Sequence, residues 1–193
     1  MKKRVLIALV AVGVWTAAGA SLTIRDIDGL EVNPLAPTGA ASVLFFVTHD
    51  CPISNSYAPE IQRICADYKS KGTACALVYV DPTIDGAGIH KHLTEYRYNG
   101  DVTAILDRTH TLVDATHATV TPEAVIVAHG GEIVYRGRID NFYAGLGKPR
   151  RQATQKDLRT ALDEVLAGKP VSHPETQSLG CYIPPLSAYV SQK

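Results

Sequence analysis

Residues 48–60 read THDCPISNSYAPE and join two segments of different character. The segment before them, residues 41–48, is a short and nearly unbroken apolar run, which is typical of a central strand buried on both faces. The segment after them carries apolar residues at helical spacing. Pro52 suits the first helical position, and Pro59 should kink the helix. Cys51 is therefore expected where a buried strand ends and a helix begins.

A thiol in this position is expected to be reactive. A helix N-terminus has unpaired N–H groups and partial positive charge, and both stabilise the thiolate, which is the nucleophilic form. The alternative is a buried, inert cysteine, because free cysteines are among the most buried residues. The position of Cys51 beside Pro52 and several polar residues favours the reactive interpretation.

The rest of the chain predicts an α/β fold. Apolar patterns predict strands and helices in the order β-α-β-α-β-α-β-β-α, with a hairpin near the end. This order implies a mixed central sheet with helices on both faces. Thr154 and Asp157 have the spacing of a capping box that opens the last helix. We expect one domain over residues 21–169 and an irregular C-terminal tail over residues 170–193.

Composition limits the classes of function. The 193 residues are 46% hydrophobic and 20% charged, as in ordinary globular domains. With 19 basic and 19 acidic residues, the net charge is zero, which argues against nucleic-acid binding, since such binding neutralises phosphates.

The N-terminus predicts export. Residues 1–20 combine a basic start, a short apolar stretch and a small-x-small cleavage pattern, so we predict a signal peptide and expect the bacterial periplasm as the compartment. No other segment is long and apolar enough to cross a bilayer, so no stable membrane span is expected after cleavage.

An oxidising compartment permits disulfides between the four cysteines. Three complete pairings exist, and the sequence does not choose between them. Cys65 lies on the apolar stripe of the first helix and Cys75 begins the second strand, so these two either form a bridge or pack in the core.

The turn around Cys51 resembles the active-site turn of the thioredoxin superfamily. Members have a C-x-x-C or C-x-x-S turn after a central strand, and a helix-kinking proline eight residues after the first cysteine. Cys51, Ser54 and Pro59 match this pattern. Members also have a cis-proline before a later hairpin, facing the reactive cysteine, and Thr121-Pro122 precedes such a hairpin here. The resemblance covers most of the chain and implies a thioredoxin-like fold.

Within the superfamily, the chain resembles exported redoxins, including peroxiredoxin-like proteins. Thr48 matches the threonine of their T-x-x-C pattern, and residues 180–183 match a G-C-x-I tail found in one such group. Ser54 replaces the second cysteine of the C-x-x-C pair, so the partner thiol must come from elsewhere. The resemblance implies that Cys181 resolves an oxidised Cys51 as a disulfide. A static structural bridge is the alternative.

The same group carries an R-I-D-[DN]-x-Y loop, which residues 138–143 match. Arg138 opens this loop and is expected near the end of the sheet that holds Cys51, where an arginine would favour the ionised thiol. A surface ion-pair network is the alternative for Arg138.

Together these features predict an exported thiol-based oxidoreductase, either a thiol-disulfide oxidoreductase or a peroxiredoxin-like antioxidant protein. Cys51 would attack a protein disulfide or a small peroxide, while Thr48 and Ser54 offer hydrogen bonds to the sulfur. The resemblance implies that Thr121 and Pro122 present backbone groups to the substrate. No organic cofactor is required, and the sequence does not identify the electron donor.

Two other functions stay open. His49, Cys51 and Cys181 offer one imidazole and two thiolates, which are soft ligands suited to Cu(I), so a copper chaperone is the main alternative. The other is a non-catalytic interaction domain in which a permanent Cys51–Cys181 bridge holds the tail in place.

Overall fold

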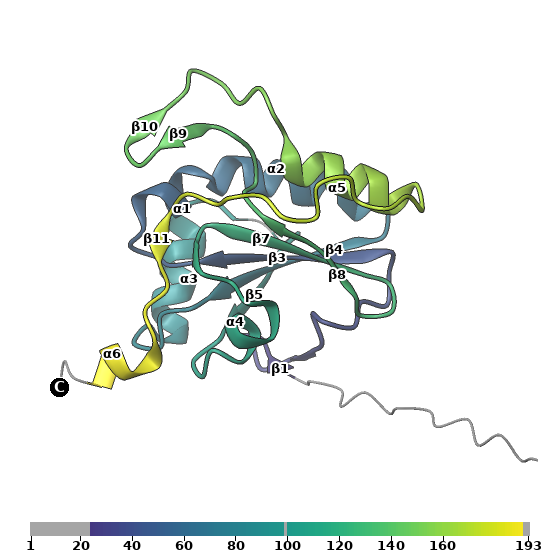
Figure 1. Ribbon diagram of the computed structural model, residues 1–193. Helices are drawn as coiled ribbons and strands as arrows, with labels where there is room; N and C mark the ends of the chain where they lie inside the picture. The colour runs from purple at the N-terminus through teal and green to yellow at the C-terminus, as the bar shows by residue number, and fades with distance from the viewer. Residues whose placement is uncertain (1–23, 99, 191–193) are drawn as a thin grey trace, which may run out of the picture.

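The molecule is built around a five-stranded sheet with the strand order β5-β4-β3-β7-β8 (Figure 1). The computed structural model describes residues 24–98 and 100–190, and the predicted signal peptide lies outside them. In their spatial order the strands span Thr103–Leu106, Thr73–Tyr79, Ala41–Val47, Glu123–Ala128 and Ile133–Gly137. Because β3 runs parallel to β4 and antiparallel to β7, the sheet is mixed, as predicted.

The central strand β3 is buried over its whole length. Its side chains alternate between two apolar clusters, one on each face of the sheet. Val43 and Phe45 belong to the first cluster, and Leu44 and Phe46 belong to the second. A strand covered on both faces explains why this segment reads as a continuous apolar run and not as an alternating one.

Helices cover both faces of the sheet, as predicted (Figure 1). On one face, α2 (Ala58–Lys69) and α5 (Asp157–Leu166) contribute their buried residues to the cluster of Phe45. The helix α3 (Gly86–Glu95) joins β4 to β5 and adds Ile89 to the same cluster. On the other face, α4 (Thr111–Thr116) packs against the cluster of Phe46.

The first predicted helix is divided in two. The short helix α1 (Pro52–Ser56) ends at Tyr57, and α2 begins directly after it. Pro59 has no N–H group to continue the hydrogen-bond ladder to the carbonyl group four residues earlier, which explains the break. The division lets α1 turn Cys51 toward the end of the sheet while α2 packs along it.

The hairpin of β7 and β8 is present, and the Thr121–Pro122 peptide bond before it is cis, as the resemblance implied. The predicted capping box is wrong. α5 begins at Asp157 without a side-chain cap, and the Thr154 N–H donates to the Asn141 Oδ1 instead, at 2.8 Å.

The tail was expected to be irregular, but it contains two short elements. β11 (Cys181–Tyr182) pairs antiparallel with β6 (Val120–Thr121), and α6 (Leu186–Val190) follows. Two further pairs of short strands lie outside the main sheet: β1 (Ile24–Arg25) with β2 (Glu31–Val32), and β9 (Tyr143–Gly145) with β10 (Lys148–Pro149). Among the described residues, no helix has the length and apolar character needed to span a membrane.

Candidate functional site

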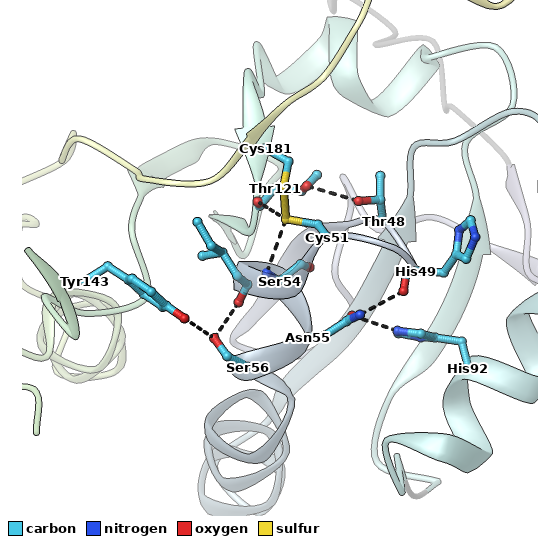
Figure 2. The surroundings of a disulfide bond; sticks show 11 residues. Thr48, His49, Cys51, Ser54, Asn55, Ser56, His92, Thr121, Tyr143 and Cys181 are labelled. Atoms are coloured by element: carbon cyan, nitrogen blue, oxygen red, sulfur yellow. Dashed lines mark hydrogen bonds between the residues drawn. A yellow bond between two sulfur atoms is a disulfide. The ribbon is translucent and has the colours of Figure 1, made fainter. Parts of the chain in front are cut away.

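Cys51 stands at the carboxyl end of β3 and caps α1 (Figure 2). Its Sγ accepts a hydrogen bond from the Ser54 N–H group at 3.4 Å. The residue is only 2% exposed. A hydrogen bond that a sulfur accepts is stronger when that sulfur is anionic, so this contact favours the thiolate once Cys51 is reduced.

A disulfide joins Cys51 to Cys181, with 6.2 Å between the two Cα atoms. Cys181 lies on β11 and is paired in register with Thr121, the residue before the cis-proline. The Cys51 Sγ lies 3.3 Å from the Thr121 carbonyl oxygen. The structure therefore brings together Cys51, Cys181, Thr121 and Pro122, which the resemblance placed in one site although they are far apart in the chain.

Two hydroxyl groups lie next to the disulfide (Figure 2). The Thr48 Oγ1 is 3.4 Å from the Thr121 Oγ1, so in this disulfide state Thr48 faces the strand that pairs with the tail. The buried Ser54 hydroxyl has no hydrogen-bond partner among the residues that the structure describes. An unpaired buried hydroxyl is unfavourable, and of the two polar groups of Ser54 it is the backbone N–H, not the predicted hydroxyl, that bonds the Cys51 sulfur in this structure.

A buried network behind the site was missed by sequence reasoning. The Asn55 Nδ2 donates to the His49 carbonyl oxygen at 2.8 Å, which holds the backbone just before Cys51. The Asn55 Oδ1 lies 2.9 Å from the His92 Nε2, and the His92 Nδ1 lies 2.8 Å from the Tyr79 hydroxyl. Since the Asn55 Oδ1 can only accept, His92 is protonated on Nε2 and accepts from Tyr79 on Nδ1.

The sequence signal that could have revealed this network is the position of His92 on the buried side of α3. A histidine among apolar residues at helical spacing needs buried hydrogen-bond partners. The pattern alone could not say that one partner would be Asn55, from a different helix.

This network predicts a pH dependence of stability. Burial, with the nearby His49 as a smaller cause, lowers the pKa of His92. As the pH falls, His92 therefore takes up a proton in the unfolded chain before it does so in the folded chain. The contribution of His92 to the free energy of unfolding is complete above about pH 6.5, the ordinary pKa of histidine, and is lost as the pH falls below that value.

Urea unfolding at a series of pH values checks this expectation. His92→Gln should flatten the dependence between pH 7 and pH 5, where one histidine contributes at most about 1.4 kcal/mol per pH unit. His173→Gln, at an exposed histidine in the tail, is the matched control and should leave the slope unchanged. Equal slopes for the two variants would contradict the assignment.

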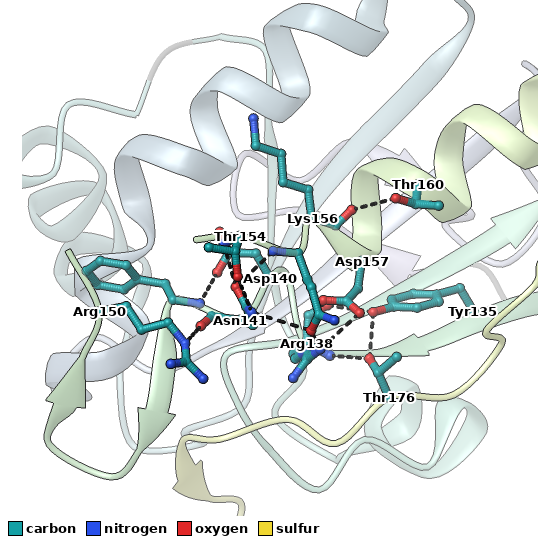
Figure 3. Close-up of polar contacts among 12 residues, drawn as sticks. Tyr135, Arg138, Asp140, Asn141, Arg150, Thr154, Lys156, Asp157, Thr160 and Thr176 are labelled. Carbon is teal, nitrogen blue, oxygen red and sulfur yellow. Dashed lines mark hydrogen bonds and ion pairs between the residues drawn. The ribbon is translucent and has the colours of Figure 1, made fainter. Parts of the chain in front are cut away.

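Arg138 takes part in an ion pair. Its guanidinium group forms a two-point ion pair with Asp157 at the start of α5, with contacts of 2.8 and 3.1 Å, and also donates to Gln155 at 2.8 Å (Figure 3). The ion pair raises the pKa of Arg138. The structure thus places Arg138 in the structural ion pair that was its alternative, where it joins the loop after β8 to α5.

The loop that Arg138 opens supports the site from behind. The Tyr57 hydroxyl, at the break between α1 and α2, donates to the Asp140 Oδ1 at 2.8 Å. The Tyr143 hydroxyl lies 3.0 Å from the Ser56 Oγ, at the end of α1 (Figure 2). Burial raises the pKa of Asp140, and the Tyr57 hydroxyl and the Phe142 N–H offset part of that cost by donating to it. The motif therefore fixes the orientation of α1.

The three ligands proposed for Cu(I), His49, Cys51 and Cys181, are not arranged as a metal site in this structure. The His49 Nδ1 lies 3.8 Å from the Asp81 Oδ2, and both thiols of the proposed set are joined in the disulfide. Within residues 24–98 and 100–190, no three His, Cys, Asp or Glu side chains form a group that could hold a metal ion.

A second disulfide joins Cys65 on α2 to Cys75 on β4. Cys65 is 1% exposed and Cys75 is 7% exposed, and both belong to the apolar cluster of Phe45. Of the two possibilities that the sequence left open for these cysteines, the disulfide is therefore the one present. Because it is buried, this disulfide is a structural bond that holds α2 against the sheet.

Removing this second bridge should reduce stability without affecting the site. The two cysteines are 10 residues apart in the chain. A bridge across a loop of this length restricts the unfolded chain, so its removal in Cys65→Ala/Cys75→Ala should lower the free energy of unfolding by about 3 kcal/mol. Urea unfolding measures the loss, and peptide mapping without reductant should still find Cys51 joined to Cys181. Loss of that pairing in the variant would contradict the structural assignment.

No family model and no curated protein matches the chain. Solved structures do. An uncharacterised conserved protein of Geobacillus kaustophilus is 26% identical, with a TM-score of 0.70, over 84% of this chain and 88% of that protein. A thioredoxin-like protein of Aeropyrum pernix is 16% identical, with a TM-score of 0.54, over 77% and 89% of the two chains.

A third similar structure is a secreted disulfide oxidoreductase of Mycobacterium tuberculosis. It is 17% identical, with a TM-score of 0.53, over 77% of this chain and 96% of that one. These likenesses establish the fold, and the central sheet, the cis-proline and the cysteine at the start of α1 agree with it. The chain therefore has the thioredoxin-like fold.

Proposed function

We propose that this protein is a thiol-disulfide oxidoreductase in which Cys51 is the nucleophile and Cys181 is the resolving thiol. The observation that carries the proposal is the disulfide between Cys51, at the start of α1, and Cys181, seated on the strand before the cis-proline. The similarity in fold to a secreted disulfide oxidoreductase supports the proposal.

The reaction balances as two thiol-disulfide exchanges. The Cys51 thiolate attacks one sulfur of a substrate disulfide, and a bond forms between them while the other substrate sulfur leaves as a thiolate. The Cys181 thiolate then attacks the Cys51 sulfur and releases the second substrate thiolate. The substrate gains two electrons, two protons from water complete its thiols, and the chain is left with the Cys51–Cys181 disulfide.

The exposure of the two cysteines suggests how an external thiol returns the chain to its reduced form. Residue Cys181 is half-buried, whereas residue Cys51 is buried, so we expect an external thiol to attack at Cys181. Attack there releases Cys51 as the leaving group, and the Ser54 N–H stabilises the thiolate that forms. The direct partners are thus protein or small-molecule thiols and disulfides.

Export to the bacterial periplasm is part of the proposal. Two disulfides within one small domain fit an oxidising compartment, where such bonds persist. The basic and apolar pattern of residues 1–20 gives independent support from the sequence.

A redox titration of the purified mature chain tests the proposal. The chain is equilibrated with mixtures of reduced and oxidised glutathione, its thiols are trapped, and its disulfides are mapped. Interconversion of the Cys51–Cys181 pair at a potential above about −300 mV supports an exchange function, because structural disulfides usually have lower potentials. A pair that mild reductant leaves intact would overturn the proposal in favour of a permanent bridge.

Substrate preference is measured in the same preparation. We expect the reduced chain to reduce a protein disulfide faster than it consumes hydrogen peroxide. Faster consumption of peroxide would assign the antioxidant reaction to Cys51 instead.

A further inference from the structure

The tail of the chain occupies the backbone edge of β6 as a peptide would. Cys181 pairs with Thr121 and Tyr182 with Val120 in an antiparallel register. The Ile183 N–H continues the pairing by donating to the Thr119 carbonyl oxygen at 3.0 Å. The tail segment of residues 180–183 therefore approaches Cys51 as an extended strand, with its own cysteine bound to the Cys51 sulfur.

The residue before the cysteine in this segment must be small. A Cβ atom built on Gly180 would lie 2.1 Å from the Thr121 carbonyl oxygen and 2.6 Å from its carbon. Both are backbone atoms next to the cis-proline, so they cannot move aside as a flexible side chain would. Any segment that binds here in the same register therefore needs glycine before its cysteine.

The two positions after the cysteine differ in burial, and so in the side chains that they can accept. Tyr182 is 70% exposed, so this position accepts many side chains. Ile183 is 6% exposed and packs into the apolar cluster of Phe46, so this position requires an aliphatic side chain. The tail segment thus reads as glycine, cysteine, any residue, aliphatic residue.

We propose that the β6 edge is a binding site for extended polypeptide segments with the pattern Gly-Cys-x-aliphatic in a partner protein, and that the tail segment is its tethered occupant. The inference rests on the proposed function and names the substrate class of the same site. The tail is also held upstream, where the Thr176 hydroxyl lies 2.7 Å from the Tyr135 hydroxyl and 3.1 Å from the Arg138 N–H that donates to it (Figure 3). Residues 177–183 can therefore leave the edge as a loop while their start stays attached.

The first test is made within the full chain. Gly180→Ala should weaken the seating of the tail and lower the equilibrium constant for forming the Cys51–Cys181 disulfide against glutathione by at least about tenfold, which corresponds to a free-energy change of about 1.4 kcal/mol. Gly86→Ala is the matched control, since a Cβ atom at Gly86 meets nothing within 4 Å. An unchanged equilibrium in Gly180→Ala would overturn the inference.

The second test supplies the segment from outside. The full-length Gly180→Ala/Cys181→Ser variant has a free Cys51 and a tail that no longer fits the edge. It is mixed with a synthetic peptide of residues 176–185 whose cysteine is joined to 5-thio-2-nitrobenzoate. The Cys51 thiolate attacks the peptide sulfur, a Cys51–peptide disulfide forms, and the coloured thionitrobenzoate anion is released and measured.

Two altered peptides give the readout, one with alanine in place of the glycine and one with aspartate in place of the isoleucine. Each should react at least about tenfold more slowly than the parent peptide, after correction for its rate with free glutathione. Equal rates for all three peptides would overturn the binding pattern while leaving the reactive cysteine intact. If Cys51 reacts with none of them faster than glutathione does, the proposed function fails as well.

Discussion

Cys51→Ser is expected to reduce the rate of disulfide exchange by at least about a thousandfold, the scale seen when an enzyme loses its nucleophile. The serine hydroxyl stays protonated at neutral pH and cannot form the sulfur–sulfur bond on which both steps depend. The Ser54 N–H and the Thr121 carbonyl group would still surround the side chain, so the fold around α1 should be preserved. The rate is measured with a reduced preparation and a protein disulfide as substrate.

Cys181→Ser should fail in a different way. Its Cys51 thiolate still attacks the substrate, but no second thiol releases the product. Without glutathione, the variant is expected to stop as a mixed disulfide on Cys51 and to release no fully reduced substrate, whereas the unaltered chain releases one per chain. Mass spectrometry of the trapped species identifies the cysteine involved.

The control for both variants is Cys65→Ala/Cys75→Ala, which removes two sulfurs without touching the site. Without glutathione it should release one fully reduced substrate per chain, because its Cys51 and Cys181 remain. Release of fully reduced substrate by Cys181→Ser at the rate of the unaltered chain would remove Cys181 from the mechanism. Disulfide exchange at an unchanged rate in Cys51→Ser would show that Cys51 is not the nucleophile.

The central part of the fold could be predicted from the sequence because local and long-range demands agree there. The continuous apolar run of β3 reflects burial on both faces, and this property is visible in the residues themselves. The position of Cys51 followed from the same run, since a strand that must stop before Pro52 leaves one place for the helix to begin. The cis-proline, by contrast, came only from the resemblance to a family.

The remainder depends on contacts between segments that are distant in the chain. Arg138 pairs with Asp157, 19 residues later, and nothing in the loop sequence distinguishes that partner from a thiolate. Asn55 and His92 meet across two helices for the same reason. The pairing of β11 with β6 was missed because a strand of two residues has no periodicity to read.

Ile183→Ala is expected to have the largest effect among changes outside the cysteines. Ile183 fills the apolar cluster of Phe46 at the end of the tail segment, so truncating it leaves a cavity and costs about 2–5 kcal/mol of unfolding free energy. Ile133→Ala, at a 39% exposed isoleucine of β8, makes the same chemical change on the surface. That control should cost much less, because little apolar area is buried there.

The same variant should also alter the redox equilibrium. The Ile183 side chain and its N–H bond to Thr119 hold the downstream end of the tail segment, just as Thr176 holds the upstream end. Loss of the downstream anchor lowers the effective concentration of Cys181 at Cys51, so glutathione should reduce the disulfide more easily than in Ile133→Ala. If Ile183→Ala is destabilised but its disulfide is as hard to reduce as in the control, Ile183 serves the core alone, and the position of Cys181 is set by the strand pairing at Thr121.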